Sequence, residues 1–130
     1  MKNYLNHLAN YSQSIIQSSP FWKSPVGWCS ILTFHRVVER EILLPGIEIN
    51  FKKFKSFIKY LKESDFEIIS IDELNNIISK GVIPNRKQIV LTFDDGYIDN
   101  YKIVYPYLSE LQIPFTIYVC NGLINKSIYI

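Results

Sequence analysis

The sequence predicts an α/β fold in which parallel strands alternate with helices. Segments with apolar residues at helical spacing alternate along the chain with short runs of β-branched and aromatic residues. The most hydrophobic of these runs, residues 89–93 (I-V-L-T-F), has the nearly continuous apolar character of a strand covered on both faces of a parallel sheet. The length of 130 residues and the hydrophobic content of 48% are enough for the core of one domain.

Residues 1–27 are expected to form an N-terminal helix and a loop ahead of the main domain. Residues 2–17 carry apolar and aromatic side chains in a loosely helical pattern, which predicts an amphipathic helix. Ser18, Ser19 and Pro20 end this helix, and the chain up to residue 27 has the composition of a loop.

The next segment is predicted to contain a strand, a loop and a helix. The strand covers residues 28–34 and ends at His35 and Arg36, and a loop with Pro45 and Gly46 follows it. Asn50 then has the side chain of a good helix N-cap. The apolar residues of this helix share one face, which is typical of a helix packed on a core; they are Phe51, Phe54, Phe57, Ile58 and Leu61.

Two further strand and helix pairs lead up to the last predicted strand. A strand over residues 66–69 precedes Ser70 and Glu73, which have the spacing of a capping box, and Gly81 ends the helix that they open. The strand over residues 89–93 is followed by a helical segment, residues 98–111, which Pro106 must kink or divide. The last strand covers residues 115–119. The order is a helix and then β-α-β-α-β-α-β, which predicts right-handed crossovers between parallel strands.

Charge indicates no nucleic-acid or membrane partner. The net charge is only +2, and Lys52, Lys53 and Lys55 fall on the outer face of a predicted helix, which we interpret as a solvated face. No stretch approaches the roughly 20 apolar residues of a membrane span. Residues 1–19 lack the apolar core of a signal peptide, so a cytoplasmic location is expected.

Cys29 and Cys120 fit no ligand pattern and are expected to be free thiols.

Two adjacent carboxylates, Asp94 and Asp95, come directly after the most hydrophobic strand and are followed by Gly96. In parallel α/β proteins, functional groups collect at the carboxyl ends of the strands. Because burying an unpaired charge is costly, these carboxylates need a metal, a base partner or solvent. One of them could bind a cation while its neighbour handles a proton. The residue types alone also allow a solvated Asx turn that leads into the next helix.

The surroundings of this pair resemble a known family. Residues 89–96 (I-V-L-T-F-D-D-G) resemble the first motif of the polysaccharide deacetylases, also called the NodB-homology or carbohydrate esterase 4 family. Residues 31–37 (I-L-T-F-H-R-V) are similar to the opening strand of that family. The resemblance extends in order over roughly residues 28–125. It implies that residues 28–130 are a partial deacetylase domain, roughly the first half of an irregular (β/α) barrel.

The resemblance also implies roles for three side chains. Asp94 would be the general base, and Asp95 would bind a divalent metal, with zinc expected and cobalt or nickel as alternatives. Such a metal lowers the pKa of its bound water to about 7 and polarises a carbonyl group. The carboxyl ends of the parallel strands form one rim of the sheet, and His35 should lie on this rim together with the two aspartates. It is either a substrate-pocket or metal-supporting residue, an ordinary structural histidine or, least expected, a metal ligand.

The sequence departs from the family in one important respect. The family completes its metal site with an H-x-x-x-H motif beyond the strand that here ends near Val119, and it has further Arg, Asp and His motifs. None is present, and the two histidines are His7 and His35. Because a catalytic zinc normally has three protein ligands, we expect a truncated chain that is inactive alone.

Three functions follow as hypotheses. The first is an incomplete metal-dependent hydrolase that removes N-acetyl, or also O-acetyl, groups from an acetylated glycan. The alternative is a non-catalytic carbohydrate-binding remnant of the family. The weakest is a small open-sheet domain that holds Mg²⁺ between the aspartates. In a truncated chain, residues 115–120 would form an exposed edge, through which self-association is expected.

Overall fold

A computed structural model of the protein describes residues 28–124. The predicted helix over residues 2–17, the loop that follows it, and His7 lie outside the described residues. The described elements, in chain order, are β1 (Cys29–Phe34), β2 (Arg36–Val38), β3 (Glu48–Asn50), α2 (Phe51–Glu63), β4 (Phe66–Ile68), α3 (Ile71–Lys80), β5 (Lys87–Phe93), the π-helical turn η2 (Asn100–Val104), α4 (Tyr105–Glu110), β6 (Thr116–Ile117) and α5 (Asn121–Ile124).

The two longest helices begin and end at the residues that the sequence predicts. The side chain of Asn50 accepts a hydrogen bond from the Lys52 amide at 3.0 Å and caps α2. The Ser70 hydroxyl accepts from the Glu73 amide at 3.1 Å and caps α3. Gly81 ends α3 in the left-handed conformation, with φ of 63°, which a glycine adopts without a steric penalty.

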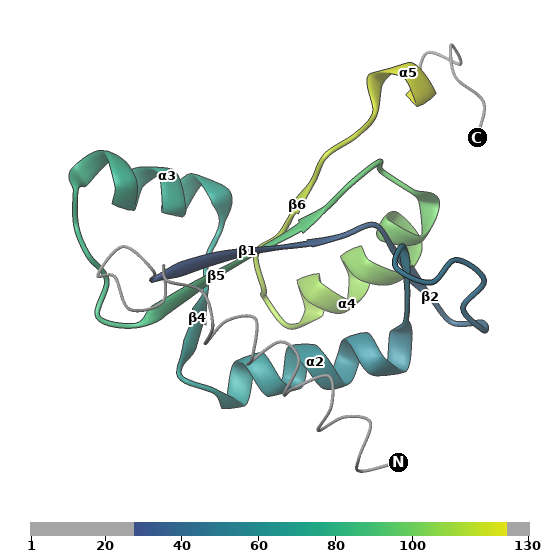
Figure 1. Ribbon diagram of the computed structural model, residues 1–130, viewed down its shortest axis with the longest axis horizontal. Coiled ribbons are helices and arrows are strands. Elements are labelled where there is room, and N and C mark those ends of the chain that lie inside the picture. Colours follow the sequence, from purple (N-terminus) through teal and green to yellow (C-terminus); the bar gives the residue numbers. More distant parts are fainter. Residues whose placement is uncertain (1–27, 125–130) are drawn as a thin grey trace.

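The main sheet is built around β5, and all of its strand pairs are parallel (Figure 1). Strand β1 lies along one edge of β5, from the pair Cys29–Gln88 to the pair Phe34–Phe93. Strands β4 and β6 share the other edge, because β4 pairs with the start of β5 and β6 pairs with Thr92 and Phe93 at its end. Strand β4 follows β1 along the chain among the strands of the main sheet. In space, however, β1 lies next to β5 and not next to β4.

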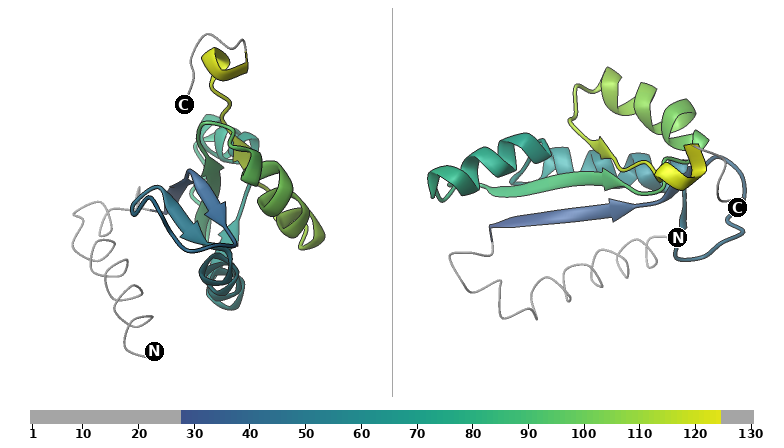
Figure 2. Two further views of the ribbon diagram at one scale, coloured as in Figure 1. Left: turned by 90° about the vertical axis from the view of Figure 1, so that its right-hand side faces the viewer. Right: turned by 90° about the horizontal axis from the view of Figure 1, so that it is seen from above.

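Helices cover both faces of this sheet. Figures 1 and 2 show α3 on one side and α2 with α4 on the other. The side chains of β5 alternate between these sides, as expected for a strand. The larger core cluster unites Leu91 and Phe93 with α2 and α4, and the smaller one packs Val90 against α3. A strand with both faces buried explains why residues 89–93 are so uniformly hydrophobic.

The predicted α/β class with parallel strands is confirmed, but several details differ from the sequence predictions. The segment expected to be a loop after His35 contains β2 and β3, which form a separate parallel pair. The last strand is limited to Thr116–Ile117, shorter than the predicted residues 115–119. Residues 100–104 are a π-helical turn, and Pro106 lies in the first turn of α4, so the helical segment is divided as expected. Helix α5 was not predicted.

The described part of the sheet is open, and the half-barrel remains a prediction. None of the helices within residues 28–124 is long and apolar enough to cross a membrane.

Candidate active site

Asp94, Asp95 and Gly96 form a tight turn where β5 ends. The Asp94 amide donates to the Phe34 carbonyl oxygen at 2.8 Å, which continues the ladder between β5 and β1 by one bond. Asp95 and Gly96 then both have a positive φ, of 69° and 67°. Aspartate is one of the few side chains that tolerate this region, and strained backbone of this kind is concentrated at functional sites. Both carboxylates are half-buried and lie at the rim of the sheet.

Gly96 permits a close approach between this turn and the chain that leaves β6. A Cβ atom at position 96 would lie 3.0 Å from Cγ1 and 3.4 Å from Cα of Val119. The distance to Cγ1 is shorter than an ordinary carbon–carbon contact of about 3.5–4.0 Å, and the distance to Cα lies at the lower limit of such contacts. The absence of a side chain at Gly96 therefore allows the two segments to pack together.

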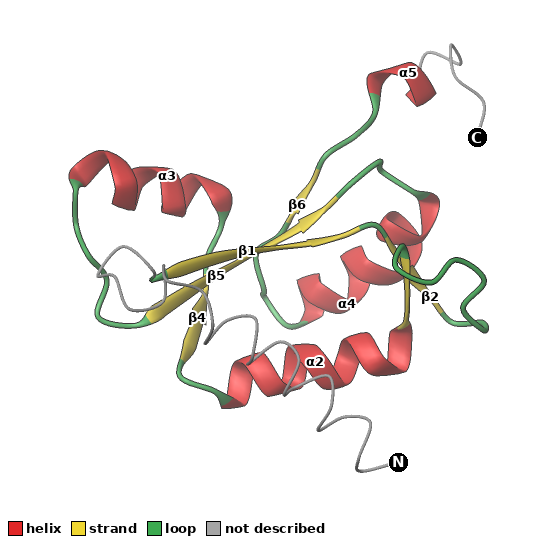
Figure 3. Cartoon of the chain, viewed as in Figure 1, coloured by secondary structure: helices red, strands yellow, loops and turns green. Residues whose placement is uncertain are grey.

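His35 lies on the same rim as the two aspartates. Strands β1 and β5 are parallel and pair Phe34 with Phe93, so His35 and Asp94 each follow the last paired residue of their strand. The arrowheads of the two strands point the same way in Figure 3. This is the placement that the sequence predicted. The chemical roles of the three side chains remain predictions.

Arg36 links this rim to the β2–β3 pair, and sequence reasoning gave it no role. Its guanidinium donates from Nε to Oδ2 of Asp99 at 2.8 Å, and Nη2 lies 2.8 Å from the same oxygen in an ion pair. Its Nη1 lies 3.2 Å from Oε1 of Glu48. The guanidinium carbon also lies 4.8 Å from the ring centre of Tyr97, within the range of a cation–π interaction. No local motif signals these contacts, because Asp99 is 63 residues away in the chain.

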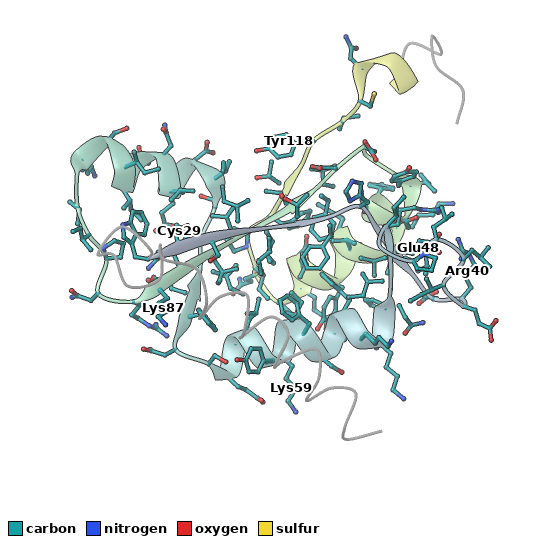
Figure 4. The ribbon with its side chains drawn as sticks, in the orientation of Figure 1. Cys29, Arg40, Glu48, Lys59, Lys87 and Tyr118 are labelled. Atoms are coloured by element: carbon teal, nitrogen blue, oxygen red, sulfur yellow. The ribbon has the colours of Figure 1, made fainter. Side chains whose placement is uncertain are left out.

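Glu48 is the most heavily bonded carboxylate in the described residues. Its side chain is fully buried. Arg40 contacts it through two nitrogens, at 2.6 and 3.1 Å, and the amides of Leu43 and Leu44 donate to it at 2.8 and 3.2 Å. Figure 4 shows Glu48 and Arg40 side by side. The hydrogen bonds from Arg40 and from the two amides hold the pKa of Glu48 down, from 4.5 to about 2.

Asn100, at the start of η2, is a second buried polar residue near the rim. It is 1% exposed, and within residues 28–124 neither its side-chain oxygen nor its side-chain nitrogen has a hydrogen-bond partner. Buried amides are normally paired, so this one is an exception. Its backbone amide donates to the Tyr97 carbonyl at 2.9 Å, which closes the segment between the aspartate turn and the π-helical turn.

The described residues do not by themselves fit a zinc centre. Between residues 28 and 124, no three side chains of His, Cys, Asp or Glu are grouped closely enough to hold a metal ion. A catalytic zinc site needs three protein ligands. The rim thus offers carboxylates that could take part in such a site, with the remaining ligands supplied from elsewhere.

The fold and the rim together define an α/β protein with paired acidic residues at the carboxyl end of its central strand. A family model described as polysaccharide deacetylase matches residues 81–128. The chain is 30% identical over 98 residues to YxkH of Bacillus subtilis, which is provisionally named a polysaccharide deacetylase. That match covers 75% of this chain and 32% of YxkH. A poly-β-1,6-N-acetyl-D-glucosamine N-deacetylase of Staphylococcus aureus is 26% identical over 107 residues, which is 73% of this chain and 37% of that protein.

Solved structures agree with these sequence matches. A de-N-acetylase from Aggregatibacter actinomycetemcomitans superposes with a TM-score of 0.59 at 27% identity, covering 68% of this chain and 36% of that one. The deacetylase PplD of Streptococcus pyogenes, solved in complex with acetate, gives a TM-score of 0.61 at 26% identity, covering 74% and 44% of the two chains. The chain is therefore similar to polysaccharide deacetylases in sequence and in fold, and residues 81–128 match the model of that family. It spans about a third of the length of the curated relatives that it matches.

Proposed function

We propose that this chain carries the general base and one metal-binding carboxylate of a hydrolase that removes acetyl groups from an N-acetylated amino-sugar polymer. The observation that carries the proposal is the strained Asp95–Gly96 turn. Asp94 and Asp95 are adjacent in this turn at the end of β5, on the same rim as His35. Similarity to an N-deacetylase of poly-β-1,6-N-acetyl-D-glucosamine supports the substrate class.

The chemistry proposed for Asp94 is general base catalysis. Its carboxylate accepts a proton from a water molecule as that water attacks the acetyl carbonyl, and the tetrahedral intermediate then collapses to an amine and acetate. Asp95 contributes one ligand to a divalent metal, for which zinc, cobalt and nickel are the candidates. Because the described residues do not complete such a site, we propose that the 130-residue chain by itself releases no acetate.

The test uses a chimaera in which residues 28–124 replace the matching segment of the Staphylococcus aureus relative. Asp94→Asn should lower kcat for acetate release by roughly 10²- to 10⁴-fold, the usual contribution of a general base, with metal content unchanged. Asp95→Asn should lower the bound metal, measured by mass spectrometry of the purified protein. Asp72→Asn, at an exposed position in the first turn of α3, is the matched control and should change neither.

Two results would contradict these roles. If Asp94→Asn and Asp95→Asn both turned over at the rate of the unmodified chimaera, neither carboxylate would take part. If the 130-residue chain bound acetylated oligosaccharides while the chimaera, folded and loaded with metal, released no acetate, the non-catalytic carbohydrate-binding alternative would be favoured instead.

A further inference from the structure

Two short segments carry all three proposed site residues, and each is anchored at both ends. His35 lies between Phe34, whose carbonyl accepts from the Asp94 amide at 2.8 Å, and Arg36. The Asp95–Gly96 turn has Asp94 on one side, whose amide makes this bond to Phe34. On its other side are Tyr97 and Asp99, which contact the Arg36 guanidinium. The backbone bond between Asp94 and Phe34 thus closes one side of the rim, and the contacts of Arg36 close the other.

The second of these anchors is built almost entirely from charged groups. Oδ2 of Asp99 accepts from Nε of Arg36 at 2.8 Å and lies 2.8 Å from Nη2 in an ion pair, and Oδ1 accepts from the Val37 amide at 3.3 Å. The Asp99 side chain is only 7% exposed, and that of Arg36 is 23% exposed. A guanidinium has a planar and rigid set of donors, so several simultaneous bonds to it determine orientation as well as distance.

Glu48 extends this anchor into the β2–β3 pair. Its buried carboxylate accepts from Arg36 at 3.2 Å, and the Arg36 amide donates to the Ile47 carbonyl at 3.1 Å. Arg36 is therefore held by its backbone and by its side chain, to partners on both sides of the rim. A purely stabilising ion pair would not need to connect these particular segments. Arg86 and Asp65 form such a pair at the opposite end of the sheet, 3.3 Å apart, with 51% and 93% of their side chains exposed.

We infer that the Arg36–Asp99 pair is a positioning device that holds His35 and the Asp94–Asp95 turn in a fixed relation to each other. This inference rests on the proposed function for its catalytic meaning. Whatever the function, breaking the Arg36–Asp99 pair should loosen the rim while leaving the rest of the sheet intact.

Amide hydrogen exchange tests whether breaking the pair loosens the rim. The exchange is followed residue by residue by NMR on the ¹⁵N-labelled 130-residue chain. The reporter is the Asp94 amide, whose hydrogen bond goes to the Phe34 carbonyl oxygen and not to Asp99. Asp99→Asn should speed its exchange roughly ten- to hundred-fold, the effect expected when a bond to a charged group is lost from a local opening equilibrium. The Ile69 amide, which bonds to the Ile89 carbonyl at 2.9 Å near the other end of β5, should keep its exchange rate.

Two further variants make the result decisive. Arg36→Lys keeps the positive charge but cannot reproduce the planar set of donors, so it should speed exchange at Asp94 by a smaller factor than Asp99→Asn does. Asp65→Asn, which removes the pair at the opposite end, should leave the Asp94 amide unchanged. In the chimaera described above, Asp99→Asn should lower kcat roughly ten-fold with KM nearly unchanged, because misplacing catalytic groups slows the reaction without weakening binding.

The inference is overturned if exchange at Asp94 stays within two-fold of the unmodified chain in both rim variants. It is also overturned if Ile69 and Asp94 speed up together, because the pair would then stabilise the whole domain. Failure of the proposed function would look different. The exchange pattern would appear as expected, and the chimaera would lose no activity when Asp94 or Asp95 is replaced.

Discussion

Replacing Gly96 with alanine tests how closely the aspartate turn packs on the chain after β6. Gly96 has φ of 67°, and a left-handed backbone costs a residue with a Cβ roughly 1–2 kcal/mol. The new Cβ would also lie 3.0 Å from Cγ1 of Val119. Overpacking of this kind typically adds about 1–3 kcal/mol, and the lower end applies here because Val119 is 55% exposed and can move. We therefore expect Gly96→Ala to lower the free energy of unfolding by about 2–3 kcal/mol.

Gly81→Ala is the matched control for the backbone term. Gly81 has φ of 63°, but a Cβ there would meet no atom within 4 Å. It should therefore cost only the roughly 1–2 kcal/mol of backbone strain. Both changes reduce the freedom of the unfolded chain equally, so that contribution cancels in the comparison. The extra cost at position 96 isolates the contact with Val119.

Urea unfolding at pH 7, followed by far-ultraviolet circular dichroism, measures both variants on one scale. The double variant Gly96→Ala with Val119→Ala should recover the contact term and leave only the strain. Equal destabilisation by Gly96→Ala and Gly81→Ala would refute the close packing. The chain after β6 would then not lie against the turn, and residues beyond it would have no direct approach to the rim.

Two other predictions concern Glu48 and the sheet edge. Because the folded protein lowers the pKa of Glu48 from 4.5 to about 2, this carboxylate stabilises the fold above pH 4.5 and loses that contribution as the pH falls toward 2. Urea midpoints should accordingly fall over this range. Glu48→Gln should be less stable than the unmodified chain at pH 7, and this difference in stability should shrink in acid. The control is Glu63→Gln, whose replaced side chain is 67% exposed, and its stability should equal that of the unmodified chain throughout. An unchanged gap between Glu48→Gln and the parent at pH 3 would contradict the assignment. For the edge, Tyr118 is 50% exposed beside β6, and size-exclusion chromatography should show self-association that Tyr118→Lys reduces; a monodisperse monomer at all concentrations would rule this out.

Much of the fold follows from local sequence. The caps of α2 and α3 depend on Asn50, Ser70 and Gly81, and each acts through atoms within a few residues of itself. The burial of β5 on both faces is visible in its composition, because a strand covered by helices on both sides has no polar face. The rim position of Asp94 and His35 also follows from sequence, since each comes directly after a strand and the strands had to be parallel.

The pairings between distant segments required the tertiary structure. Strands β2 and β3 have three residues each, too few for a periodic pattern, and they are held by ion pairs of Glu48 that no local motif reveals. The neighbour of β1 could not be read from chain order, because the hydrophobic pattern of a strand does not name its partner. The Arg36–Asp99 pair likewise joins residues 63 positions apart. Sequence by itself determined which residues reach the rim. Only the folded chain decided how they are held there, because long-range charge pairs form between groups whose proximity is a consequence of the whole fold.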